Sequence, residues 1–240
     1  MIMKSERFDF KHFSLMHGQS PMKVGVDSIL LGCWTDLNSS HRILDVGTGC
    51  GLLALMCAQR AAEAEIDAVE IDSPSFKEAD NNFKTSPWKD RLSAILVDFS
   101  NFNGKSYDLI ISNPPYFNSG VNKIVKSRER ARHQDSLSPK ILIERGRCML
   151  TPNGKISMII PFQQIEDLSQ FVLKHEMAVN RLTIIKGREE LPPKRAMIEL
   201  VNRAAFNINN VERSTFVIEK FPGQPTEEFK TLCKDFYLEF

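Results

Sequence analysis

Seven short apolar runs, the first five separated by helix-like segments, restrict the fold of this 240-residue chain more than any other feature. Runs of this length predict buried strands, and their alternation with helices is typical of the βαβ units of a parallel sheet. We therefore expect an α/β fold in which a seven-stranded, mostly parallel sheet carries helices on both faces. The runs cover residues 42–47, 66–71, 92–98, 108–112, 155–161, 181–186 and 196–203.

The last two runs predict a change of direction in the sheet. Only nine residues, 187–195, connect them, and this segment contains Gly187, Pro192 and Pro193. A parallel crossover needs a dozen or more residues, so we expect an antiparallel hairpin at the sheet edge.

Capping and turn residues predict further elements in the second half of the chain. Ser138 followed by Pro139 is a favourable N-cap and first-turn pair, and it predicts a helix to about residue 150. Residues 151–154 should end this helix before the next strand. The tail, 226–240, has apolar residues at helical spacing and should pack against the body.

A glycine-rich loop directly follows the first predicted strand. Its glycines, Gly47, Gly49 and Gly51, permit a sharp turn and a close approach of the backbone to a ligand. A dinucleotide site expects the pattern G-x-G-x-x-G, which would require glycine at Leu52. This mismatch disfavours a nicotinamide-dependent oxidoreductase. Asp45, just before the loop, would suit a cationic amine, which a pyrophosphate site would not favour.

Carboxylates end the next two predicted strands. Glu70 lies nineteen residues after Gly51, where an acidic side chain can accept hydrogen bonds from ribose hydroxyls. Asp98 and Phe99 end the third strand and place a carboxylate beside a ring at the same sheet edge. The alternative is that Asp98 caps the N-terminus of a helix or solvates a loop. An acidic pocket with ribose and purine subsites fits S-adenosylmethionine.

The sequence Asn113-Pro114-Pro115-Tyr116 closes the strand 108–112. Two prolines fix two φ angles and disfavour helical geometry in the residues that precede them. The stiff loop presents two acceptors for an amino group, the Asn113 side-chain oxygen and the Pro114 carbonyl, while Tyr116 can stack on a planar ring. The pattern indicates a site that grips a planar molecule with an exposed amine.

Together these motifs resemble the class I S-adenosylmethionine-dependent methyltransferases that methylate amino groups. The resemblance covers roughly residues 20–205 and implies a Rossmann-like fold. It also implies that the segment 23–27 helps to cover the cofactor, although its residues alone indicate only a loop entering a buried helix. The implied cofactor contacts are Lys23, Asp45, Gly47, Thr48, Gly49, Gly51, Glu70, Ile71, Asp98, Phe99 and Asn113.

Members of this family use such loops on adenine N6 in DNA or RNA, on guanine N2 in ribosomal RNA, and on a glutamine amide of release factors. The segments 22–32, 43–56, 112–117, 131–137 and 235–238 resemble a bacterial branch that methylates the adenine next to the anticodon of a valine tRNA. That resemblance implies a tRNA partner and catalytic roles for Asn113, Pro114, Pro115 and Tyr116. A remote alternative is a non-catalytic RNA-binding protein, which the intact acidic and amide positions disfavour.

A basic stretch follows the loop. Residues 123–147 include eight Lys or Arg and three Asp or Glu, a composition suited to phosphate contacts. The simpler interpretation of the basic stretch is a solvated surface, and His133 would then be an exposed loop histidine. For Lys194 the simpler interpretation is a hairpin tip that exposes the lysine to water. The predicted substrate contacts are Tyr116, Phe117, Arg128, Arg130, Arg132, His133, Lys194 and Arg195.

Composition fits one domain spanning residues 1–240, with a cofactor-covering segment (1–41), a catalytic core (42–205) and a C-terminal extension (206–240). No apolar run approaches the roughly 20 residues that span a bilayer. Five cysteines without a C-x-x-C pair indicate reduced thiols, a cytoplasmic location and no structural zinc. The sequence does not determine the oligomeric state.

Overall fold

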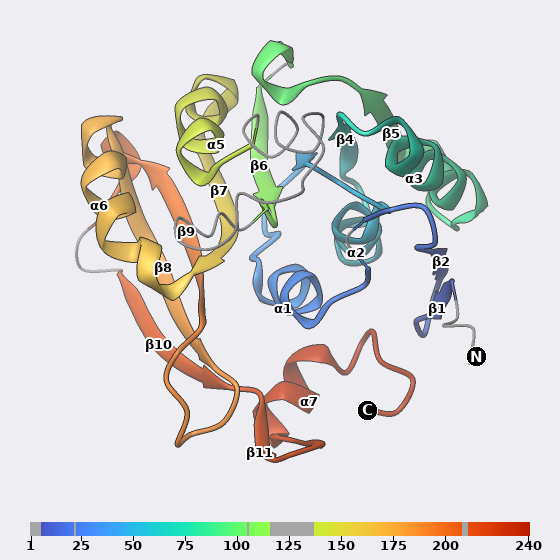
Figure 1. Cartoon of the computed structure of the whole chain (residues 1–240). Coiled ribbons are helices and arrows are strands. Elements are labelled where there is room, and N and C mark those ends of the chain that lie inside the picture. Colours follow the sequence, from blue (N-terminus) through green and yellow to red (C-terminus); the bar gives the residue numbers. More distant parts are fainter. Residues whose placement is uncertain (1–5, 22, 105, 116–136, 208–210) are drawn as a thin grey trace, which may run out of the picture.

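An eight-stranded sheet forms the centre of the computed structural model, which describes residues 6–21, 23–104, 106–115, 137–207 and 211–240. The strand order is β10-β8-β9-β7-β6-β3-β4-β5, and all seven expected strands are present (Figure 1). β9 runs antiparallel to both neighbours, whereas the other pairs are parallel. The strands are β3 (Arg42–Val46), β4 (Glu65–Glu70), β5 (Leu92–Leu96), β6 (Tyr107–Ser112), β7 (Leu150–Pro161), β8 (Met177–Lys186), β9 (Arg195–Asn202) and β10 (Glu212–Val217).

The eighth strand corrects the expected count of seven. β10 pairs in parallel with β8, so the β8–β9 hairpin lies inside the sheet and not at its edge. β10 has only one buried residue, Phe216, and its first four residues are exposed. An edge strand with such a polar sequence produces no apolar run, which is why the pattern did not indicate it.

Helices cover both faces of the sheet, as expected. Figure 1 shows α1 and α2 on one side and α5 and α6 on the other. Side chains of β6 alternate between two hydrophobic cores: Leu109 and Ile111 pack with α1 and α2, and Ile110 packs with α5 and α6. The helices are α1 (Val26–Trp34), α2 (Leu52–Arg60), α3 (Ser73–Thr85), α5 (Pro139–Gly146), α6 (Ile165–Lys174) and α7 (Glu227–Cys233).

Three local expectations need correction. The described part of the β5–β6 connection holds a 3-10 turn, Phe99–Asn101, and not a helix. Ser138 caps α5 as predicted and the helix ends before residue 151, but residues 151–154 already belong to β7, where they form a bulge between the residues paired with Tyr107 and Leu109. α7 ends at Cys233, and the aromatic residues beyond it pack without helical structure.

The two ends of the described chain pack on the same core. A small hairpin of β1 (Arg7–Asp9) and β2 (Ser14–Met16) brings Phe10 and Phe13 into the cluster that also holds Phe229 and Phe236. Lys11 joins hairpin and tail directly, because its amide donates to the Phe236 carbonyl and its Nζ to the Phe240 carbonyl. A second small hairpin, β11 (Glu219–Phe221) with β12 (Gln224–Pro225), precedes α7.

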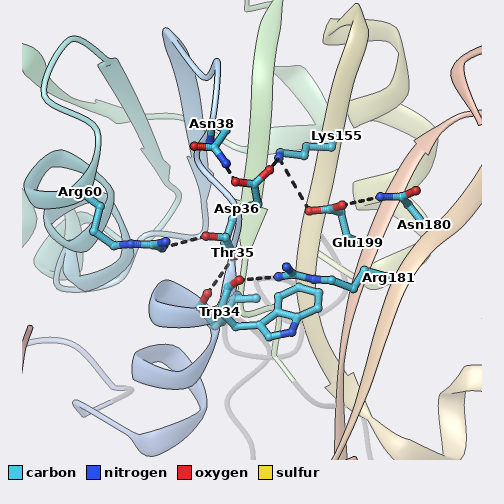
Figure 2. A network of polar contacts seen from close by, with 10 residues as sticks. Trp34, Thr35, Asp36, Asn38, Arg60, Lys155, Asn180, Arg181 and Glu199 are labelled. Atoms are coloured by element: carbon cyan, nitrogen blue, oxygen red, sulfur yellow. Dashed lines mark hydrogen bonds and ion pairs between the residues drawn. The ribbon is translucent and has the colours of Figure 1, made fainter. Parts of the chain in front are cut away.

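A network of polar side chains attaches the C-terminal end of α1 to the amino-terminal edge of the sheet (Figure 2). Lys155 Nζ lies 2.7 Å from Asp36 Oδ2 and 3.9 Å from Glu199 Oε2. The Arg181 guanidinium stacks 3.6 Å from the centre of the Trp34 ring. α1 therefore spans the sheet from this edge to the opposite one, where the carboxyl ends of the parallel strands form the site described next.

Candidate cofactor and catalytic site

A cavity of about 800 Å³ opens at the carboxyl ends of β3, β4 and β6. This is the edge where open α/β sheets place their ligands. Many of the residues expected to bind cofactor or substrate line it: Lys23, Gly47, Thr48, Gly49, Glu70, Ile71, Asn113 and Pro115. The rest of the lining comes from residues 18–21, Val24, Ser28, Cys50, Leu52, Leu53, Asp72, Pro74, Ser75 and Leu137.

The glycine loop is shaped by its backbone conformation. Gly47 and Gly49 have φ values of 70° and 59°, a region that favours glycine. Gly51, with φ 89°, is the N-cap residue of α2 and does not line the cavity, and a Cβ there would lie 2.5 Å from the Phe83 ring. The amides of Gly47 and Thr48 both donate to the Val69 carbonyl, so the loop folds over the end of β4.

Glu70 is buried at the end of β4 and supports the loop. Its Oε2 accepts from the Gly49 amide at 2.8 Å, and its Oε1 accepts from the amides of Ile71 and Asp72, each at 2.9 Å. A carboxylate has about four acceptor positions. Three backbone bonds leave about one acceptor position for a ligand hydroxyl, so a ribose whose two hydroxyls both bind Glu70 must share or replace one of the amide contacts.

Asp45 lies deeper than expected. Its carboxyl group is fully buried and does not line the cavity. Oδ2 accepts from the Thr48 hydroxyl at 2.6 Å and from the Ala54 amide at 3.1 Å, while Oδ1 has no hydrogen-bond partner. Burial raises the pKa of Asp45 to about 7, against the two hydrogen bonds, which lower it. Its binding of a cationic amine stays a prediction.

The described part of the proline loop is fixed next to the glycine loop. The Ser112 hydroxyl donates to the Val46 carbonyl at 2.7 Å, which joins the ends of β6 and β3. Asn113 Nδ2 then donates to Ser28 Oγ on α1 at 2.9 Å. Pro115 lines the cavity, but Pro114 does not. Six expected residues lie outside the described residues: Tyr116, Phe117, Arg128, Arg130, Arg132 and His133.

The two remaining pairs of expected site residues are placed away from the cavity lining. The Asp98 side chain accepts from the Ser100 amide and caps the 3-10 turn, and Phe99 is buried in the second core. Their contribution to adenine binding stays a prediction. Lys194 is exposed, whereas Arg195 Nε lies 3.0 Å from Asp27 Oδ2 in a part-buried ion pair.

Sequence reasoning missed the residues of α3 that hold the N-terminal wall of the cavity. Glu78 accepts from the amides of Gln19 and Ser20, both at 2.9 Å. Asn82 accepts from the Met16 amide, and its Nδ2 donates to the carbonyls of Met16 and Cys50. Buried polar side chains four residues apart on a helix are a signal that could have identified this pair.

The described residues contain no group of three or more His, Cys, Asp or Glu side chains placed to hold a metal ion. None of the helices in the same part of the chain combines the length and the apolar composition that a membrane span requires.

The family model named methyltransferase small domain matches residues 23–181. The chain belongs to this family. It is also 38% identical over 240 residues to a protein of Parabacteroides distasonis, covering 99% of this chain and 100% of the relative. A protein of Vibrio vulnificus is 38% identical over 244 residues, covering 99% and 98%. Both relatives are named tRNA1(Val) (adenine(37)-N6)-methyltransferase.

Solved structures agree on the class I methyltransferase fold. The predicted O-methyltransferase Atu636 from Agrobacterium tumefaciens has a TM-score of 0.65 at 16% identity, covering 88% of this chain and 96% of Atu636. TYW2 from P. horikoshii, in complex with MeSAdo, has a TM-score of 0.57 at 16% identity, covering 79% and 68%. The protein is a methyltransferase of this fold, and as a member of the methyltransferase small domain family it uses S-adenosylmethionine as its methyl donor.

The residues around the cavity fit that donor. Glycines at 47 and 49 leave the floor without side chains: a Cβ on Gly47 would lie 2.6 Å from Leu137, and one on Gly49 would lie 3.3 Å from Ser20 Oγ. Glu70 retains an acceptor position beside the Ile71 amide, which suits a ribose next to a base. The apolar side chains of Leu52, Leu53 and Leu137 suit the remaining uncharged surface.

Proposed function

We propose that this protein methylates the N6 amino group of adenine 37 in valine tRNA with S-adenosylmethionine. One observation carries the proposal: relatives with this name match nearly the whole chain at 36–38% identity. The position of Asn113 and Pro115 on the wall of the cofactor cavity supports it, because an amine acceptor is needed there.

The proposed chemistry uses the methyl group of a sulfonium, which is already activated for transfer. The lone pair of adenine N6 is delocalised into the ring, so the amine is a poor nucleophile. Asn113 Oδ1 and the Pro114 carbonyl would each accept one N–H and thereby localise the pair on nitrogen. Orientation and fixed dipoles then supply most of the acceleration, without a strong base.

The tRNA must present its target base outside the stack, at a cost of a few kcal/mol. We propose that Tyr116 offsets part of this by stacking, worth roughly 1–3 kcal/mol. Phe117 and His133 would flank the base, Arg128, Arg130 and Arg132 would contact phosphates, and Lys194 would do so from the β8–β9 loop. Such an enzyme works where tRNA matures, so we also propose a cytoplasmic location.

The deciding experiment is transfer of labelled methyl to total bacterial tRNA, followed by nucleoside analysis. We expect N6-methyladenosine in tRNA, and mapping should place it at adenine 37 of valine tRNA. Label in ribosomal RNA or in a protein glutamine would keep the enzyme class and contradict the tRNA substrate.

Asn113→Ala tests the catalytic role. This variant should lose most of its methyl transfer activity and still bind S-adenosylhomocysteine and tRNA. Asn153→Ala, which removes the same group from an exposed position of the β7 bulge, is the matched control. Unchanged transfer by Asn113→Ala would contradict the mechanism, and binding of tRNA by a wild-type protein that transfers no methyl would favour a non-catalytic RNA-binding role.

A further inference from the structure

Ser28 is the partner of the catalytic amide on the α1 side of the cavity. Its Oγ accepts from Asn113 Nδ2 at 2.9 Å, and both residues line the cavity. An asparagine side chain carries a carbonyl oxygen, which accepts hydrogen bonds, and an NH2 group, which donates them. Because Nδ2 of Asn113 donates to Ser28, its Oδ1 lies on the other side of the amide group, away from Ser28. The reversed amide would place N–H groups against the N–H groups of a substrate amine, and the two donors would repel each other.

The first turn of α1 depends on tertiary contacts for its position. Its N-cap residue is Gly25, and no side chain caps the helix start. Uncapped amides leave a helix end free to fray unless other contacts hold it. Ser28 lies in this turn, so the geometry of its hydrogen bond with Asn113 depends on how firmly the turn is held in position.

The ion pair between Arg195 and Asp27 supplies such a contact. Arg195 begins β9, and its Nε lies 3.0 Å from Asp27 Oδ2, with 31% and 28% of the two side chains exposed. Asp27 is also the acidic residue of the first turn, where negative charge is favourable against the helix dipole. The pair thus joins the first residue of β9 to the residue that precedes Ser28 in α1.

We infer that Ser28 is a positioning residue that fixes the Asn113 amide for the substrate amine, and that the Arg195–Asp27 pair holds Ser28 in place. This inference rests on the proposed function, since it specifies how the amine acceptor is oriented. It also gives Arg195 a different role from the substrate contact expected from the sequence.

Ser28→Ala tests the inferred role of Ser28 in positioning the Asn113 amide. It should lower kcat by about 10- to 100-fold, because small misplacements of reacting groups cost that much. KM for tRNA and the Kd of S-adenosylhomocysteine should stay near wild type, and Ser28→Thr, which keeps the hydroxyl, should restore most of kcat. Ser169→Ala is the matched control, because it removes a helical hydroxyl of α6 that donates to the Ile165 carbonyl.

A second readout is independent of catalysis. The side-chain NH2 resonances of Asn113 in a 15N-labelled protein should shift in Ser28→Ala and not in Ser169→Ala. The inference would be overturned if Ser28→Ala changed neither the Asn113 resonances nor kcat. It would also be overturned if Ser28→Ala raised KM for tRNA and left kcat at the wild-type value. A wild-type protein that methylates no adenine would contradict the proposed function, and the resonances would still decide the Ser28 contact.

A double-mutant cycle tests whether the Arg195–Asp27 pair acts by holding Ser28 in place. Arg195→Ala should lower kcat less than Ser28→Ala does, and it should cause no further loss when Ser28 is already alanine. Arg203→Ala, an exposed arginine just beyond the other end of β9, controls for lost charge. Fully additive losses, or a raised KM for tRNA with a weaker salt dependence, would place Arg195 on the RNA and overturn this part of the inference.

Discussion

The Glu70 carboxyl group accepts a hydrogen bond from the Gly49 amide at 2.8 Å, so the residue expected to bind ribose also holds the glycine loop. The two roles are coupled. A ligand that takes Glu70 Oε2 changes the partner of the Gly49 amide, and a substitution at Glu70 changes both the predicted ribose site and the glycine loop.

Glu70→Gln should therefore weaken cofactor binding strongly. The glutamine oxygen can keep the Ile71 and Asp72 amides, but its NH2 group then faces the Gly49 N–H, donor against donor. Hydrogen bonds to charged groups contribute about 1.5–3 kcal/mol, so we expect Kd for S-adenosylhomocysteine to rise about 10- to 100-fold by calorimetry. Glu65→Gln, exposed at the start of the same strand, should bind as wild type. Equal Kd values for both variants would contradict this role of Glu70.

Asn82→Ala should loosen the N-terminal wall of the cavity. The substitution removes three hydrogen bonds, to both backbone groups of Met16 and to the Cys50 carbonyl, and Asn82 is only 2% exposed. We expect faster amide hydrogen exchange in residues 16–21, measured by mass spectrometry, together with weaker cofactor binding. Asn81→Ala, exposed on the same helix, should change neither quantity. Exchange at the wild-type rate in Asn82→Ala would show that Glu78 alone holds the segment.

What the sequence predicted well depends on local patterns. Apolar runs located every strand with buried side chains on both faces, such as β6, and Ser138 with Pro139 located the start of α5. The glycine and proline motifs identified the cavity because parallel strands end at one edge. β10 was missed because one buried residue makes no pattern.

The rest depends on tertiary contacts between distant positions. Ser28 and Asn113 are 85 residues apart, and Gln19 and Glu78 are 59 apart, so no local spacing indicates either pair. Arg195 was interpreted as a substrate contact because it forms a basic pair with Lys194 behind two prolines. Its partner Asp27 becomes visible only when β9 and α1 are folded together.

Lys155→Met should destabilise the fold without touching the site. Lys155 is 12% exposed and lies between Asp36 and Glu199, and Glu199 is itself 5% exposed (Figure 2). Removing one partner of a buried ion pair costs about 3–5 kcal/mol, because a buried charge is left uncompensated. The loss should appear as a lower urea midpoint, and Lys155→Met combined with Glu199→Gln should recover part of it. A double variant less stable than Lys155→Met would contradict this explanation.

Asp45 should make the stability of the protein fall as pH rises. Burial raises its pKa from 3.8 to about 7 in the folded state, so the folded protein keeps a proton that the unfolded chain has released. The contribution of this proton to the free energy of unfolding is fully present below about pH 4. It is lost as the pH rises from about 4 to 7, by at most about 1.4 kcal/mol per pH unit.

Asp45→Asn removes this titration, and the comparison with wild type isolates it from other carboxyl groups. The free energy of unfolding of Asp45→Asn minus that of wild type, from urea titrations at pH 5, 6, 7 and 8, should increase up to about pH 7 and then level off. Asp90→Asn, exposed beside α3, should give a difference that does not rise in this way. A difference for Asp45→Asn that is constant from pH 5 to 8 would mean that the carboxyl group is already ionised in the folded protein at pH 5.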